Sequence, residues 1–213
     1  MGNKLRNIIG REEFDYPSLM SALSGYANPR SKVTSLLRKG VIVRVKKGLY
    51  VFGDDFRRRP FSRELLGNLI YGPSFVSLDY ALSYHGLIPE RVAAVTSVTT
   101  KREKRFETPV GLFVYRRTPK ASFHLGMTRI AQNDFAFLIA CPERALADKL
   151  RDDRGINAGS LHALAAYLFD GLRLDREGFL ALDPELLTMI AKALGSRKVE
   201  LCSRLLQRMR TAG

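Results

Sequence analysis

Hydrophobic positions near the start of the chain recur at helical spacing and then begin to alternate with polar ones. This pattern predicts three short helices at residues 3–9, 14–23 and 28–39, followed by a β-hairpin at 41–52. In the third helix Asn28 fits the capping position, Pro29 the first helical position and Gly40 the residue after the end. Three helices followed by a hairpin are typical of a winged helix-turn-helix, which we expect over residues 1–53.

The third predicted helix has an apolar side and a basic, hydroxyl-rich side. Val33, Leu36 and Leu37 recur at i, i+3 and i+4 and are expected in the core. The other side carries no acidic residue, whereas a solvated helix face usually mixes both signs of charge. We expect it to contact phosphates and base edges in the major groove of double-stranded DNA; a basic solvated face is the alternative. The candidate DNA-binding residues of this helix are Arg30, Ser31, Lys32, Thr34, Ser35, Arg38 and Lys39.

The predicted hairpin adds a second basic surface. Its first strand alternates valine at positions 41, 43 and 45 with Ile42, Arg44 and Lys46, and Lys47-Gly48 fits a tight turn. The alternation places Arg44 and Lys46 on one face of the strand. Arg44, Lys46 and Lys47 are therefore expected to contact DNA phosphates, which adds affinity without reading sequence.

A basic linker is predicted at residues 54–60, after the hairpin. It ends in Arg57-Arg58-Arg59-Pro60, where a proline closes a run of three arginines. The sequence leaves open whether these arginines touch a phosphate strand or form a solvated hinge.

The remaining residues, 61–213, predict a larger α+β domain whose C-terminal part is helical. Its first part is expected to hold helices at 61–71, at 77–84 and from 142 to 150, and strands at 92–100, 111–117, 122–130 and 135–140. Residues 101–105 are expected to form a charged turn, whose contact with DNA is left open. The last helices are expected at 158–169, 176–182, 184–194 and 197–209, with Asp175, Asp183 and Ser196 as caps.

Charge strengthens the prediction of a polyanionic partner. The chain of 213 residues carries a net charge of +14, and residues 1–60 hold 13 basic and 5 acidic residues. Nucleic acid and an acidic membrane surface both fit such an excess, but membrane binding needs a broad exposed apolar helix face that the pattern does not show. No apolar run reaches the roughly 18 residues of a membrane span, and the N-terminus has no apolar leader, so we expect a cytoplasmic protein.

The residue types that carry out catalysis form no motif. His85, His124 and His162 lie in no metal-binding pattern, and the chain has no nucleotide-binding or serine-hydrolase motif. Cys141 and Cys202 form no disulfide framework and are expected to be buried thiols. Glu143 and Asp148 are five positions apart and do not share a helix face. We expect Glu143 to stabilise the N-terminus of its own helix instead. We expect no enzyme activity, no cofactor and no metal; a nuclease built from dispersed residues is the alternative.

Three stretches resemble the AbiEi-type antitoxins, the regulatory half of type IV toxin–antitoxin pairs. They are LRKGVI at 37–42 with KGLY at 47–50, PSFVSLDYALSYHGL at 73–87, and CPERALADKL at 141–150. The resemblance covers most of the chain up to about residue 150; beyond that point only the helical pattern matches.

The resemblance implies a function that spacing does not show. Such proteins bind repeats in their own promoter through the N-terminal winged helix and repress their operon. Their second domain is needed to counteract a nucleotidyltransferase-like toxin, usually without a stable complex. The alternative is a stand-alone transcription factor whose second domain senses a ligand or partner, and a monomer on two inverted repeats or a dimer on one palindrome both remain open.

Overall fold

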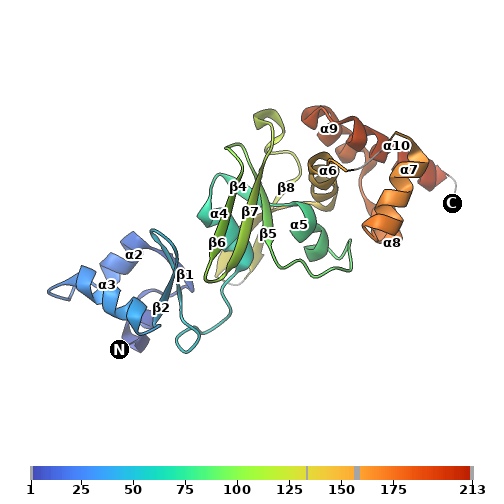
Figure 1. Cartoon of the computed structure of the whole chain (residues 1–213). Coiled ribbons are helices and arrows are strands. Elements are labelled where there is room, and N and C mark those ends of the chain that lie inside the picture. Colours follow the sequence, from blue (N-terminus) through green and yellow to red (C-terminus); the bar gives the residue numbers. More distant parts are fainter. Residues whose placement is uncertain (1, 133, 156–158, 212–213) are drawn as a thin grey trace.

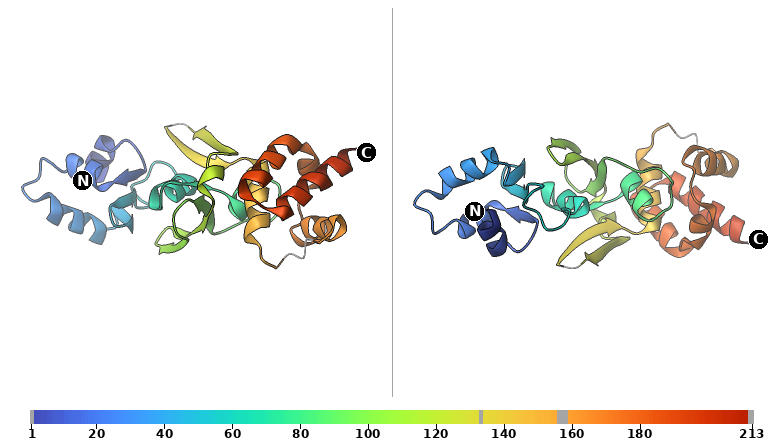
Figure 2. Two further views of the ribbon diagram at one scale, coloured as in Figure 1. Left: turned by 90° about the horizontal axis from the view of Figure 1, so that it is seen from above. Right: turned by 90° about the horizontal axis from the view of Figure 1, so that it is seen from below.

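The computed structural model describes residues 2–132, 134–155 and 159–211, and it has a mixed α+β architecture. A three-stranded antiparallel sheet lies near the N-terminus, a six-stranded mixed sheet follows, and helices make up the C-terminal part (Figure 1). The three parts follow one another along an elongated molecule, with the two ends of the chain at opposite ends (Figure 2).

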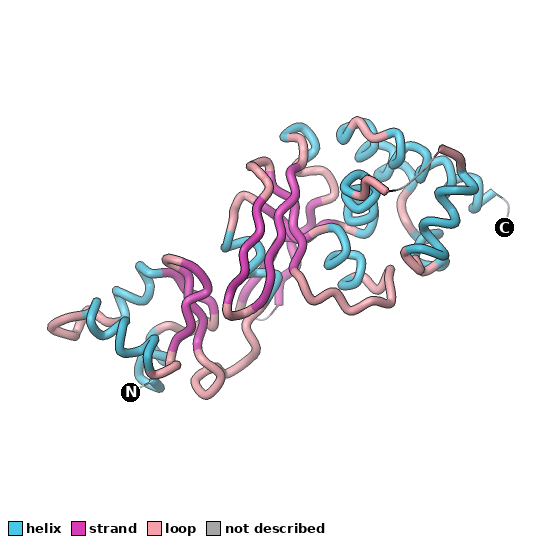
Figure 3. The backbone as a smooth tube through the Cα atoms, in the orientation of Figure 1, coloured by secondary structure: helices cyan, strands magenta, loops and turns pink. Residues whose placement is uncertain are grey.

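The first unit packs three helices on one face of a small sheet (Figure 3). Its elements in chain order are α1 (Gly2–Ile8), β1 (Glu13–Asp15), α2 (Tyr16–Ala22), α3 (Pro29–Arg38), β2 (Ile42–Lys46) and β3 (Leu49–Phe52). The strands are ordered β1-β3-β2 and all pairs are antiparallel. Leu19, Leu36 and Phe52 are among the buried side chains that join the helices to the sheet.

The second helix begins later than the sequence predicts. Residues 13–15 form strand β1 instead, so the predicted helix at 14–23 is wrong at its start. Asp15 caps α2 because its carboxylate accepts a hydrogen bond from the amide of Ser18 at 2.9 Å. Phe14 is drawn into the core, where its ring lies 4.9 Å from that of Phe52. Burial against the hairpin therefore outweighs the helical spacing at this end.

The third helix has the predicted ends. The Asn28 side chain accepts a hydrogen bond from the Ser31 amide at 3.1 Å, Pro29 is the first helical residue, and Gly40 follows the end with φ at 67°. A positive φ of this kind favours glycine because no side chain is strained there.

Two glycines close the first unit. The amide of Gly53 donates to the carbonyl of Val41 at 3.0 Å, and a Cβ added to Gly53 would lie 1.9 Å from the carbonyl oxygen of Gly40. A side chain at position 53 would therefore collide with the Gly40 carbonyl unless the backbone moved and the hydrogen bond between Gly53 and Val41 was lost.

Replacing Gly53 by alanine is therefore expected to lower the free energy of unfolding by about 1–3 kcal/mol, the usual cost of overpacking. Urea unfolding followed by circular dichroism measures it, since the chain has no tryptophan. Gly25→Ala is the matched control, because nothing lies within 4 Å of an added Cβ there. Equal stability of the two variants would contradict the prediction.

The second unit is built on the six-stranded sheet, whose strand order is β6-β7-β5-β4-β9-β8. β4 is antiparallel to β5 and parallel to β9, while β5 is parallel to β7. Helix α4 lies on the side of the sheet toward the first unit, and α5 and α6 lie on the other side (Figure 1). The elements are α4 (Arg63–Ile70), β4 (Ser74–Val76), α5 (Leu78–Tyr84), β5 (Val95–Thr99), β6 (Lys104–Thr108), β7 (Gly111–Arg117), the 3-10 turn η1 (Lys120–Ser122), β8 (Met127–Gln132), β9 (Phe135–Ala140) and α6 (Pro142–Asp152).

Three segments of this unit differ from the prediction. Ser74–Val76 is a strand at the centre of the sheet, too short to show an alternating pattern. Lys104 and Arg105, expected in a turn, begin strand β6, which pairs with β7. The strand expected at 122–130 starts only at Met127, because the Arg144 guanidinium binds the carbonyls of Ser122 and Leu125 and holds a turn there.

The C-terminal part is helical, as predicted. It holds α7 (Leu161–Ala166), the π-helical turn η2 (Tyr167–Gly171), α8 (Arg176–Ala181), α9 (Pro184–Leu194) and α10 (Arg197–Thr211). The caps predicted at Asp175 and Asp183 are confirmed, since both carboxylates accept amide hydrogen bonds from the following turn. Ala158, where α7 was expected to begin, lies outside the described residues. Among the helices of the described part, none is long and apolar enough to span a membrane.

Candidate nucleic-acid interface

Helix α3 presents its basic, hydroxyl-rich side to solvent. Val33 and Leu36 are buried against the sheet of the first unit and thereby set the orientation of the helix. The helix lies on the side of that sheet away from the six-stranded sheet (Figure 1), so the second unit does not cover it. The predicted residues that are exposed on this helix and just after it are Arg30, Ser31, Thr34, Arg38 and Lys39.

Two of the predicted residues of α3 lie at the edges of this face. Lys32 and Ser35 are half-buried, and the Lys32 ammonium lies 5.0 Å from the centre of the Tyr26 ring. The Thr34 hydroxyl points back along the helix toward the carbonyl of Arg30 at 3.4 Å. The outward surface thus combines cations and hydroxyls, and no carboxylate interrupts it within Pro29–Arg38.

The hairpin carries two exposed cations beside this helix. Arg44 is exposed and its guanidinium lies 5.9 Å from the centre of the Tyr50 ring. Lys47 is exposed in the turn, where Gly48 adopts a φ of 87°. Both positions agree with the places predicted for them.

Lys46 lies elsewhere than predicted. The pairing of β2 with β3 shifts by one residue between Arg44 and Lys46, which is the signature of a β-bulge. The bulge turns Lys46 away from the face of Arg44 and toward the second unit, where its ammonium donates to the carbonyl of Ile70. Burial there lowers the pKa of Lys46 below its ordinary value. Lys46 is therefore a residue of the junction, and the expectation that it shares a face with Arg44 is wrong.

The three arginines of the linker have protein partners. Two buried carboxylates of the first unit hold the segment: Glu12 accepts the amides of Arg58 and Arg59, and Glu13 accepts the amide of Ser62. The Arg59 guanidinium lies 3.5 Å from Glu13, 3.2 Å from Asp134 of the second unit and 4.4 Å from the centre of the Phe135 ring.

The other two arginines are also engaged. Arg57 lies 3.1 Å from Asp54 and over the ring of Phe61, and Arg58 binds the Asn7 side chain. Contacts from both units therefore fix the segment that joins them.

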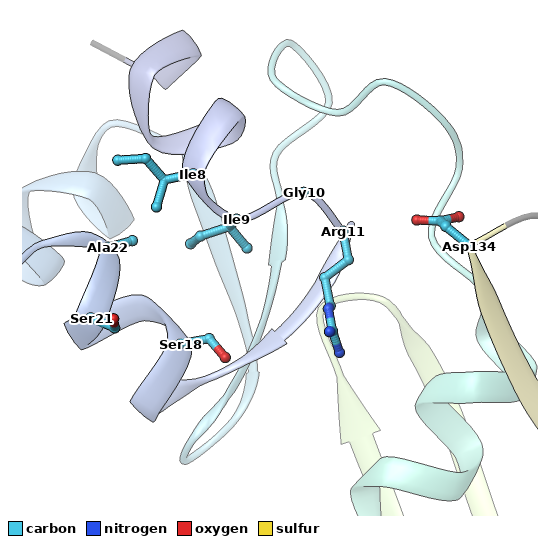
Figure 4. A pocket seen from close by; sticks show the side chains of 8 residues that line it. All are labelled: Ile8, Ile9, Gly10, Arg11, Ser18, Ser21, Ala22 and Asp134. Atoms are coloured by element: carbon cyan, nitrogen blue, oxygen red, sulfur yellow. The ribbon is translucent and has the colours of Figure 1, made fainter.

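A shallow groove lies between the end of α1 and the exposed side of α2 (Figure 4). Ile8, Ile9 and Ala22 form its apolar side, and the Arg11 side chain extends along it toward the junction. Asp134 reaches it from the second unit, but its carboxylate is bound to Arg59, which lowers the pKa of Asp134. The groove thus offers a single cation and no arrangement of groups for acid–base chemistry.

The three histidines and two cysteines are distributed over the second unit and the C-terminal helices. His85 ends α5, and its Nε2 lies 2.7 Å from the carbonyl of Ala140. His162 is exposed on α7, and His124 is exposed in the turn before β8 instead of in a strand. Cys202 is buried as expected, whereas Cys141, at the N-cap of α6, is only half-buried. Burial raises the pKa of each thiol to about 12, which keeps both neutral. In the described ranges, no group of three or more His, Cys, Asp or Glu is arranged to hold a metal ion.

The carboxylates of α6 serve packing. Glu143 lies in the first turn of α6, as expected, and its carboxylate also accepts the amide of Asp183 at 2.8 Å, which joins α6 to the start of α9. Asp148 is fully buried beside Arg144 and accepts the Ser77 hydroxyl at 2.7 Å. Burial raises the pKa of Asp148, and the Arg144 guanidinium opposes that rise.

Comparison with known proteins gave no matching family model and no matching curated protein. Function is therefore inferred from the exposed surface of the molecule and from the resemblance of the three sequence stretches.

Proposed function

We propose that residues 2–53 form a winged helix-turn-helix that binds double-stranded DNA, with α3 in the major groove and the hairpin along the phosphate backbone. The observation that carries this proposal is the exposed face of α3, which combines cations and hydroxyls, contains no carboxylate and is left uncovered by the rest of the described chain. Strand β1 supports it, since it pairs with β3 and completes a small sheet behind the helices.

The residues divide between two kinds of contact. Arg30 and Arg38 have the planar guanidinium that pairs with the O6 and N7 atoms of guanine, and the hydroxyls of Ser31 and Thr34 suit base edges or phosphates. Lys39, Arg44 and Lys47 surround this face and fit phosphate contacts; Lys32 and Ser35 lie at its edge.

We further propose that the protein represses its own operon and acts as the antitoxin of a type IV toxin–antitoxin pair. The support is the resemblance of its three stretches to AbiEi-type antitoxins. Co-expression with the nucleotidyltransferase-like protein of a neighbouring gene tests this: restored growth supports the antitoxin role. Unrestored growth with intact operator binding would leave a stand-alone transcription factor.

Gel-shift titration tests DNA binding directly. The protein is titrated against its own upstream DNA with a scrambled duplex as competitor, at two salt concentrations. The expected result is tight binding that resists the competitor. Weak binding to both duplexes that disappears with salt would contradict sequence-specific recognition.

Lys47→Ala is expected to weaken binding to the upstream and scrambled duplexes alike. A lost phosphate contact lowers the slope of log affinity against log salt by about 0.9. Lys192→Ala is the matched control, since Lys192 is exposed on α9 at the opposite end of the molecule (Figure 1). A salt slope for Lys47→Ala equal to that of the control would remove the hairpin turn from the interface.

A further inference from the structure

Three lysines from distant parts of the chain meet beside the C-terminal end of α4. Lys46 comes from the hairpin, Lys101 from the turn before β6 and Lys104 from the first position of β6. The ammonium groups of Lys101 and Lys104 lie 5.4 and 5.3 Å from the centre of the Tyr71 ring, and Lys46 binds the neighbouring carbonyl of Ile70. We call these three residues the lysine cluster.

Among the described residues, no carboxylate forms an ion pair with the lysine cluster. In the part of the chain that the structure describes, none of the salt bridges involves Lys46, Lys101 or Lys104. The nearby acidic side chains are engaged elsewhere: Glu103 lies 3.3 Å from Arg116, and Glu107 lies 3.0 Å from Arg105.

The uncompensated positive charge of the lysine cluster affects the pKa of Lys46. The positive charges of Lys101 and Lys104 lower its pKa further, in addition to burial. Three cations held together without a counter-charge repel one another, and a bound anion relieves that repulsion.

Helix termination accounts for only part of this arrangement. Lysines near the end of a helix commonly bind its last carbonyls, and Lys46 does so at Ile70, the last residue of α4, while Lys101 binds the carbonyl of Gly72 just beyond the helix. Each ammonium has three donors, so both lysines keep further donors for a ligand. The Lys104 ammonium lies 5.3 and 5.6 Å from the centres of the Tyr71 and Phe106 rings. Binding of helix-end carbonyls therefore does not explain the position of Lys104.

We propose that the lysine cluster binds a phosphate group of the DNA backbone and extends the DNA contact from the hairpin onto the second unit. The proposal rests on the DNA binding proposed above. Lys47, exposed at the hairpin turn, is the chain neighbour of Lys46 and connects the two surfaces. A duplex bound across both units requires them to keep one orientation, which the contacts of Arg59 with Glu13 and Asp134 provide.

The test is a titration of the full chain with its upstream duplex over a series of salt concentrations. Lys101→Gln/Lys104→Gln removes two charges from the lysine cluster, and Lys192→Gln/Arg204→Gln removes two exposed charges at the other end of the molecule. We expect the first variant to lower the salt slope by about 1 to 2 and the control to leave it unchanged. The affinity for scrambled DNA should fall as much as that for the upstream duplex, because phosphates carry no sequence information.

Each outcome separates this inference from the proposed function. Equal salt slopes for the wild type and the first variant, with intact binding by the wild type, overturn the lysine cluster as a DNA contact and leave the winged helix standing. No binding by the wild-type chain overturns both. The same titration is made with single-stranded RNA of equal length. If Lys101→Gln/Lys104→Gln weakens binding to this RNA but not to the duplex, the assignment to duplex DNA is overturned. Circular dichroism of both variants verifies that they remain folded.

Discussion

Arg30→Ala/Arg38→Ala is expected to lose most of the affinity for the protein's own upstream DNA. Both guanidinium groups are exposed on α3, and their eight-residue separation spans about 12 Å along the helix axis. Each bidentate contact with a base contributes about 1–3 kcal/mol of discrimination, and contacts this far apart are nearly additive. The double variant should therefore lose about 2–6 kcal/mol, or roughly 30-fold to 10⁴-fold in affinity.

A charge-preserving variant makes this prediction specific to base recognition. Arg30→Lys/Arg38→Lys retains the positive charges and loses the planar guanidinium, because lysine is a point charge. We expect it to bind scrambled DNA like the wild type and to bind the upstream duplex much more weakly. Fluorescence anisotropy with both duplexes measures the two affinities. Equal losses of the alanine variant on both duplexes, with full activity of the lysine variant, would show that α3 binds phosphates only.

Arg144→Met is expected to cost about 3–5 kcal/mol of folding stability, the usual effect of removing one partner from a buried ion pair. Arg144 is fully buried on α6, and its Nε lies 2.9 Å from Asp148. Its other nitrogens donate to Thr118 and to the carbonyls of Ser122 and Leu125. Methionine leaves the buried Asp148 carboxyl without its guanidinium partner, and urea unfolding followed by circular dichroism measures the loss of stability.

Two further variants control this experiment. Arg151→Met changes an exposed residue of the same helix that makes one hydrogen bond, to the carbonyl of Arg117, and should stay within about 0.5 kcal/mol of the wild type. Arg144→Met/Asp148→Leu removes both charges and should regain part of the stability lost in Arg144→Met. Equal losses in Arg144→Met and Arg151→Met would show that the buried pair does not stabilise the fold.

Local chemistry determines the ends and the outward side of α3. The ends of α3 follow from Asn28, Pro29 and Gly40, which act on the backbone within one turn of the helix. Its outward side follows from the spacing of Val33 and Leu36, since burying these two determines what faces solvent. The candidate DNA-binding helix was therefore predictable as an element and as a surface.

Strand pairing determines features that local periodicity does not show. Alternation along β2 assigned Arg44 and Lys46 to one face, but the bulge that separates them arises from pairing with β3. The three-residue strands β1 and β4 also escaped prediction, because so short a segment is extended only when partner strands bind it. The face of the sheet on which a side chain lies thus depends on the partner strand, which local periodicity does not reveal.

By itself, the sequence determined α3 with its caps, the caps of α8 and α9, the strongly basic first unit and the exposed side of α3. Each of these depends on residues within a few positions of one another. Tertiary structure alone decided that Lys46 faces the second unit, that buried Glu12 and Glu13 hold the linker, and that Lys101 and Lys104 join Lys46 beside Tyr71. The reason is physical: each of these contacts joins segments at least 24 positions apart in the chain, so only tertiary packing brings the groups together.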